Sequence, residues 1–185
     1  MPGKLTSVEI YTTSHRVLGR ITPGSAGIYS FLNVPTTSYL EVESAHLSRL
    51  HQPGKLAGRF PVLWLVKTEI VAVLLSSRIE LGPSGMARGG YSTTVPHAVH
   101  IALHGYELRG TVETAGKFNF GALMFEGDRI FVPLYAAEIT AILFPNVRAE
   151  SAALLFNRNM VDTMAQLPRE ERPHPAPPAS PPPAA

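Results

Sequence analysis

The chain of 185 residues contains no cysteine. This absence excludes disulfide bonds, thiolate-bound zinc, iron–sulfur clusters and cysteine nucleophiles. Charged residues are also few, at 16% of the chain, and they nearly balance, with 16 basic and 14 acidic side chains. The resulting net charge of +2 argues against a strongly basic nucleic-acid surface and against an acidic interaction tail.

Long apolar runs are equally scarce. The longest spans residues 60–75, is interrupted by Lys67 and Glu69, and is too short to cross a bilayer. Residues 1–9 hold one lysine and no apolar stretch of signal-peptide length. We therefore expect a soluble, cytoplasmic protein without a membrane span.

The apolar residues that are present alternate with polar ones along much of the chain. The alternation is clear in residues 8–21, 39–50 and 61–75, where β-branched residues are also frequent, as is typical of strands. Nothing before Arg78 shows a helical period longer than about two turns. Since apolar residues make up 45% of the chain, a true core can form. The sequence therefore predicts an all-β fold.

The second half of the chain repeats the pattern of the first. The opening matches are Val8 with Val99, Ile10 with Ile101, Val17 with Leu108, Gly19 with Gly110, and Ile21 with Val112. Near the end of each half, LLFNRNMV at 154–161 resembles WLVKTEIV at 64–71, each with a polar turn between two apolar runs. A shared order of strands, turns and glycines indicates an internal duplication.

The repeat divides the chain into four predicted parts. Residues 1–80 and 96–166 form two small, strongly bent antiparallel β-barrels in tandem, of roughly five strands each. Residues 81–95 are a Gly/Ser-rich linker, and 167–185 are a disordered tail rich in proline and alanine. The tail is either a plain disordered end or a docking ligand for an aromatic groove.

Short motifs in residues 5–78 carry a resemblance to known proteins. After the opening strand pair come FLN at 31–33, the strand YLEVESAHL and a closing turn VKT at 66–68. These motifs resemble a family of small uncharacterised bacterial β-barrel domains. The resemblance implies a compact bent barrel, similar in shape to Sm-like barrels, and supplies no catalytic residues. The second half lacks FLN and has FGALMF at 120–125 instead.

Three histidines are candidates for a metal site, because His97, His100 and His104 are close in sequence and Glu107 is near them. On a strand, His100 and His104 share a face. A zinc site needs three or four convergent ligands with fixed partners behind them. The pattern favours solvated histidines instead, and we predict no metal and no other cofactor.

Arg16 and Arg20 have a spacing similar to that of the cyclic-dinucleotide-binding PilZ barrels, in which two guanidinium groups grip phosphates. The Asp/Asn-x-Ser-x-x-Gly element that PilZ proteins also need has no counterpart, since residues 43–46 lack its spacing and its glycine. Two arginines on a solvated strand face are the alternative that the sequence favours.

No sequence motif of an enzyme is present. There is no Gly-x-Ser-x-Gly elbow, no phosphate-binding Gly-x-x-x-x-Gly-Lys-Ser/Thr loop, and no pair of carboxylates that the pattern places across a cleft. An Sm-like RNA-binding pore remains an alternative. Its basic, aromatic and amide candidates are Tyr106, Arg109, Lys117, Phe118, Asn157, Arg158 and Asn159.

The most apolar strand of the chain suggests a different function. Trp64, the single tryptophan, is flanked by Leu63 and Leu65, so that both faces of the strand are apolar. One face of a barrel wall covers its own core, and the other needs the sister domain or another chain. We predict a non-catalytic interaction or assembly module that binds a protein partner or its own copies through Leu63, Trp64 and Leu65.

The tail should be dispensable for folding. Because residues 168–185 have almost no apolar side chains to bury, ordering them would cost about 1–2 kcal/mol per residue without return. We expect the chain truncated before Pro168 to keep its melting temperature in a calorimetric scan. A fall of many degrees would instead show that the tail docks on the folded part.

Overall fold

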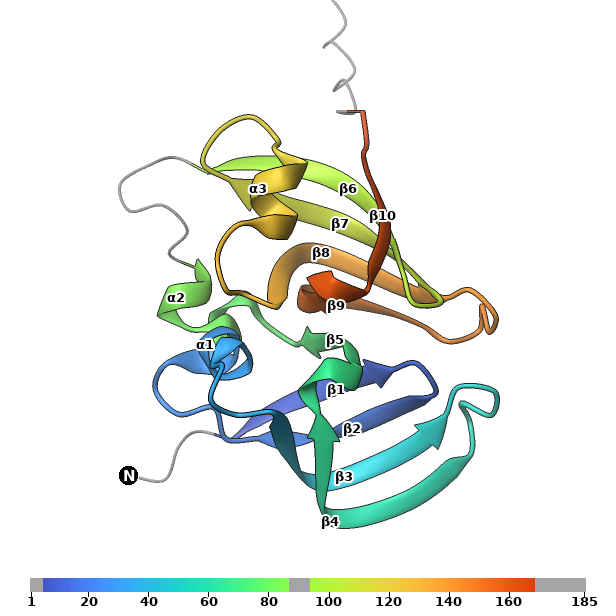
Figure 1. Ribbon diagram of the computed structural model, residues 1–185. Coiled ribbons are helices and arrows are strands. Elements are labelled where there is room, and N and C mark those ends of the chain that lie inside the picture. Colours follow the sequence, from blue (N-terminus) through green and yellow to red (C-terminus); the bar gives the residue numbers. More distant parts are fainter. Residues whose placement is uncertain (1–4, 87–93, 169–185) are drawn as a thin grey trace, which may run out of the picture.

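The computed structural model describes residues 5–86 and 94–168. Within these ranges ten antiparallel strands form one open sheet, which Figure 1 shows curling into two lobes. The predicted all-β class is thus confirmed at the level of a sheet-dominated fold. Two separately closed barrels are not seen, because one continuous sheet runs through both halves.

Each half of the chain contributes five strands and short helical segments. The strands of the first half are β1 (Thr6–Thr12), β2 (His15–Ile21), β3 (Tyr39–Arg49), β4 (Leu56–Val66) and β5 (Ile70–Leu75). Those of the second half are β6 (Val95–Leu103), β7 (Tyr106–Thr114), β8 (Phe131–Ala141), β9 (Arg148–Asn157) and β10 (Val161–Gln166). The α-helices are α1 (Gly27–Asn33), α2 (Pro83–Met86) and α3 (Phe120–Phe125), and the 3-10 turns are η1 (Lys67–Glu69), η2 (Arg78–Leu81) and η3 (Arg158–Met160).

The two halves have the same strand order. It is β4-β3-β2-β1-β5 in the first half and β9-β8-β7-β6-β10 in the second. Val8 lies opposite Gly19 in the first hairpin, and Val99 lies opposite Gly110 in the matching one. The sequence match of these two glycines is therefore confirmed by the strand register.

Both glycines stand at a β-bulge. The pairing of β2 with β3 shifts its register at Gly19, and that of β7 with β8 shifts at Gly110. The strand that faces each glycine contains a non-glycine residue with positive φ, Ser44 at 50° and Ala136 at 45°. Bulges bend a strand and increase its twist, so both halves curl at the same place.

The fourth strands match one residue away from the predicted alignment, which placed Trp64 with Leu154. Trp64 pairs with Glu41, which lies three residues before the positive-φ residue Ser44 on β3. In the second half, Leu155 pairs with the residue three before the positive-φ residue Ala136 on β8. Leu155 is therefore the counterpart of Trp64. A slip of one residue exchanges the two faces of a strand. Trp64 and Leu155 therefore face the same way relative to their halves.

Strand β5 joins the two halves at the centre of the sheet. It pairs with β1 on one side and with β9 on the other, and all six of its residues are buried. Its side chains divide between two cores, so that Val73 packs with the first half and Leu74 with the second. In β9, Leu155 and Leu154 do the same. Each core therefore contains side chains from both halves.

Polar contacts reinforce this junction. The Asn33 side chain, at the end of α1, accepts hydrogen bonds from the backbone N–H groups of Ile130 and Phe131 at 2.9 Å each, and donates to the Phe131 carbonyl at 3.0 Å. From the second half, the Tyr106 hydroxyl donates to the Thr12 carbonyl at 2.6 Å. Asn33 ends the FLN motif, so this motif connects the two halves.

A basic residue after the fourth strand binds the end of the short helix in each half. Lys67 Nζ donates to the carbonyl oxygens of Phe31 and Val34 at 3.0 and 3.2 Å. In the second half Arg158 donates to the Glu126 carbonyl at 2.8 Å. Burial lowers the pKa of Lys67, and these carbonyls, at the negative end of a helix, favour a cation.

Part of the predicted domain organisation lies outside the described residues. The predicted linker, 81–95, begins in η2 and α2 and ends in β6, with 87–93 not described. The predicted tail is described only at Leu167 and Pro168, where the Leu167 N–H donates to the Ala98 carbonyl at 2.8 Å. The domain boundaries therefore stay a prediction.

The bulge glycines should resist substitution in both halves. An added Cβ would lie 2.4 Å from Val42 Cγ1 at Gly19, and 2.8 Å from the Tyr135 carbonyl oxygen at Gly110. We expect Gly19→Ala and Gly110→Ala each to lower the free energy of unfolding by about 1–3 kcal/mol in urea titrations. Gly54→Ala is the control, since its Cβ would meet no atom within 4 Å. Equal stability of all three variants would contradict this account.

Candidate functional site

The strongest candidate for a functional surface is the outer face of the edge strand β4. This strand pairs only with β3 among the described residues, and none of its residues is fully buried. Trp64 is 62% exposed, Val66 53%, and Tyr39, directly opposite Val66 on β3, 51%. Together with the half-buried Val62, these residues define the β4 surface. Exposed apolar groups gathered on an unpaired edge are typical of interaction sites.

The same face is covered in the second half. The residues that match the β4 surface are Phe131 for Tyr39, Ala153 for Val62, Leu155 for Trp64 and Asn157 for Val66. All four are buried, and the first three belong to the core of the first half. A face that the fold buries in one half is thus exposed in the other. The sister domain does not cover Trp64, contrary to the simpler of the two sequence interpretations.

The three residues selected from the sequence divide between two environments. Leu63 and Leu65 are partly buried and pack against the core of the first half, whereas Trp64 points outward and donates from Nε1 to Glu41 Oε2 at 3.1 Å. Their joint role in an interaction stays a prediction. The sequence analysis missed Tyr39, because pairing between β3 and β4 is what brings it beside Val66.

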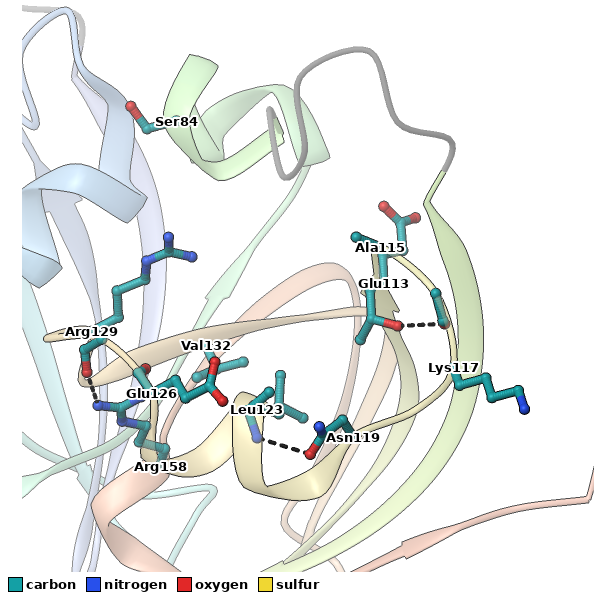
Figure 2. Close-up of a pocket in the computed structure, with 14 residues that line it drawn as sticks. Ser84, Glu113, Ala115, Lys117, Asn119, Leu123, Glu126, Arg129, Val132 and Arg158 are labelled. Atoms are coloured by element: carbon teal, nitrogen blue, oxygen red, sulfur yellow. Dashed lines mark hydrogen bonds between the residues drawn. The ribbon is translucent and has the colours of Figure 1, made fainter.

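A cavity of about 660 Å³ lies where α2 and the segment around α3 approach one another (Figure 2). Its charged lining residues are Glu113, Lys117, Glu126, Arg129 and Arg158. Arg158 binds backbone carbonyls, and Glu113 accepts from Arg78 at 2.7 Å. Thr114, which also lines the cavity, has its Oγ1 3.0 Å from His97 Nε2 and donates to the Gly116 carbonyl at 2.9 Å.

The three candidate histidines lie beside different groups. His97 Nε2 lies 2.9 Å from the Gly116 carbonyl, His104 Nδ1 lies 3.2 Å from the Met160 carbonyl, and His100 is 3.9 Å from Glu107. In the described part of the chain, no group of three or more His, Asp or Glu side chains is arranged to hold a metal ion.

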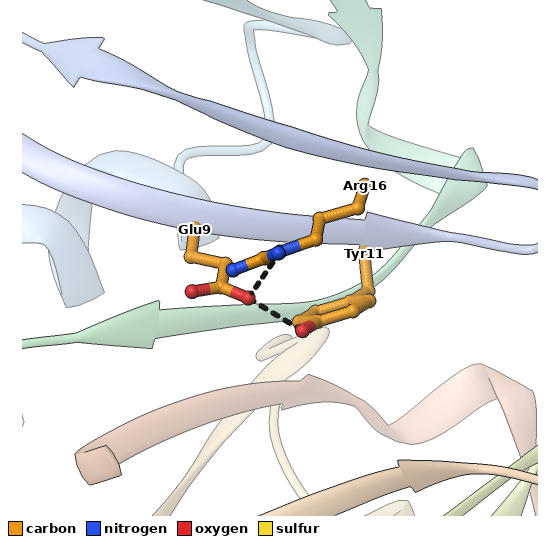
Figure 3. A network of polar contacts seen from close by, with 3 residues as sticks. All are labelled: Glu9, Tyr11 and Arg16. Atoms are coloured by element: carbon orange, nitrogen blue, oxygen red, sulfur yellow. Dashed lines mark hydrogen bonds and ion pairs between the residues drawn. The ribbon is translucent and has the colours of Figure 1, made fainter. Parts of the chain in front are cut away.

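Arg16 and Arg20 bind different side chains in this structure. Figure 3 shows Arg16 on the Glu9 carboxylate, with Nε 2.7 Å from Oε1, and the Tyr11 hydroxyl donating to the same oxygen. Burial, reinforced by Glu9, raises the pKa of Tyr11 above its ordinary value, so the hydroxyl remains a donor. Arg20 donates to Ser44 Oγ at 2.9 Å.

Several of the RNA-binding candidates have structural partners. Tyr106 is buried, with its ring edge-on to Tyr11 at 5.7 Å, and cannot stack on a base. Asn157 is buried and donates to the Ile70 carbonyl at 3.1 Å. Arg158 and Lys117 line the cavity. Tyr106 and Asn157 are therefore not accessible on the surface.

Comparison with known proteins identifies no relative: no family model, no curated protein and no solved structure matches the chain. Among residues 5–86 and 94–168, no helix has the length and apolar composition needed to cross a membrane. The assignment of a function must therefore rest on the surfaces and contacts of the molecule itself.

The two faces of β4 should respond differently to substitution. We expect Trp64→Ser to change the free energy of unfolding by less than about 1 kcal/mol, because the indole is mostly exposed. Leu63→Glu should lower it by about 2 kcal/mol or more, because it places a charge against the core. Urea titrations at low protein concentration measure both. A Trp64→Ser loss as large as that of Leu63→Glu would show that the indole is buried.

Proposed function

We propose that the protein is a non-catalytic interaction module that binds a protein partner at the edge of β4. The observation that carries the proposal is the exposure of Trp64, Tyr39 and Val66 on a face that is buried in the matching half. Tryptophan and tyrosine are the side chains that most often dominate the energy of an interface. An unsatisfied apolar face beside them favours a partner that excludes water.

The backbone of β4 supports recognition by strand addition. An edge strand presents unpaired N–H and C=O groups to which an extended segment of a partner can bind, while pockets for alternate side chains give specificity. Pro61 lacks an N–H and limits this pairing on one side. The segment from Val62 to Val66 is therefore the part of the edge that suits a partner strand.

The proposal includes an origin by duplication. We infer that residues 1–80 and 96–166 derive from one small bent β-barrel domain, joined by residues 81–95 and followed by a tail. The equal strand orders, the two bulge glycines and the paired cation contacts support this view. The resemblance to small bacterial β-barrel domains and a cytoplasmic location belong to the same proposal.

An affinity capture from native lysate tests the function. The tagged chain should retain a protein, and Trp64→Ser should reduce the retained amount about tenfold or more, as loss of a central anchor does. Ile79→Ser is the matched control, since Ile79 is 74% exposed but lies on η2, away from β4. Retention of nucleic acid instead, or retention unaffected by Trp64→Ser, would contradict the proposal.

A further inference from the structure

The junction inside the chain shows how one half of the sheet binds the other. There the fifth strand of the first half, β5, pairs with the fourth strand of the second half, β9. The remaining fourth and fifth strands are β4 and β10. In the described ranges each pairs with one neighbour, and they form the two edges of the sheet, β4 in one lobe and β10 in the other (Figure 1).

We propose that β10 of one copy of the chain pairs antiparallel with β4 of a second copy, in the register of the internal junction. This inference rests on the proposed function and identifies the partner as the chain itself. It places Met164 opposite Trp64 and Gln166 opposite Val62. Because the two edges are different surfaces, the contact is head-to-tail and leads to a ring or a filament.

The register follows from matched positions in the two halves. Val73 of β5 and Met164 of β10 each lie opposite the matching isoleucine of the first strand in their halves. At the junction Val73 pairs with Leu155, which occupies the place of Trp64. The new pairing would therefore continue the sheet with the same kinds of strand and bury Trp64 as Leu155 is buried.

The β10 side of the proposed contact also carries exposed apolar side chains at matched places. Leu50 follows β3, packs into the second-half core and is 4% exposed, whereas its counterpart Ile142 is 49% exposed. Asn33, at the end of α1, binds the start of β8. Its counterpart at the end of α3, Phe125, is 75% exposed. Both side chains are placed to contact the neighbouring copy.

The contact between copies should be weaker than the internal junction. Strand β5 presents Val71 and Leu74 to the other half, and both belong to its core. At the matching places β10 has Asp162 and Ala165, which are exposed. Less apolar area is buried in this way, so less free energy is gained. The association is therefore reversible and depends on protein concentration.

The chain's own terminal segment is a poor alternative partner for β4. Residues 169–185 are rich in proline, and proline cannot donate the hydrogen bonds that hold an added strand. Pro61 of β4 does not oppose pairing with β10. In β9, residues 153–156 pair with β5, and they match Val62–Leu65 of β4. Pro61 precedes this segment and therefore lies outside the proposed pairing.

Cysteine cross-linking tests the register directly, because the natural chain has no cysteine. Full-length Val62→Cys and Gln166→Cys chains, distinguished by a tag, are mixed and oxidised. We expect the mixed disulfide to form about tenfold faster than in a mixture of Val66→Cys with Gln166→Cys. Four residues along a strand are about 13 Å, which exceeds the reach of a disulfide.

Three outcomes of the cross-linking would overturn the proposal. Equal rates for the two mixtures would show that the register is wrong. Faster dimerisation of the Val62→Cys chain with itself would show that β4 pairs with β4. Absence of any disulfide dimer in the Val62→Cys and Gln166→Cys mixture would show that the two edges do not meet.

Light scattering separates this inference from the proposed function. The wild-type chain should exceed its monomer mass of 20.0 kDa as its concentration rises from about 1 to 100 μM, Trp64→Ser should stay monomeric, and Ile79→Ser should behave as wild type. A monomer mass throughout would overturn self-association. Trp64-dependent capture of a different protein from lysate would then still support the proposed function, and loss of that capture as well would remove both.

Discussion

The structure depends on the pairing of β5 with β9. Strand β5 lies at the centre of the sheet, and both of its faces are buried, so it is a wall shared by two cores. Leu74 and Leu154 complete one core, and Val73 and Leu155 complete the other. Neither half has a full core without the other. The hydrogen bonds of Asn33 satisfy backbone groups at the start of β8 and hold the same junction from outside.

Features that depend on local constraints could be predicted from the sequence. The bulges need glycine because a Cβ at Gly19 or Gly110 would collide with the facing strand, and this steric demand repeats in both halves. The alternation of apolar and polar residues predicted the strands, because successive side chains of a strand point to opposite faces of the sheet. The sequence alignment of the fourth strands, β4 and β9, is wrong by one residue. A continuous apolar run such as Val62–Val66 does not show which of its faces is buried, so the sequence does not determine the alignment.

The rest required knowledge of contacts between distant segments. Helices α1 and α3 are each shorter than two turns, so no periodicity could show them. The role of Asn33 depends on residues almost a hundred positions away. The sequence singles out the apolar strand around Trp64, but the exposure of Trp64 follows from the place of β4 at the end of the sheet. Strand β4 lies at the end of the sheet because β5, the next strand in the chain, pairs with β1 and β9 and not with β4.

The same choice of partner explains the contrast between the two edges. A long edge strand with an exposed tryptophan favours aggregation, because the edge strand of another chain can pair with it. Here Pro61 removes one N–H from β4 and Asp162 places a charge on β10. Together they restrict pairing to a short segment and weaken it. A permanent contact would be served better by apolar residues on β10, such as those of β5. The residues of the two edges therefore suit a contact that forms selectively and can be released.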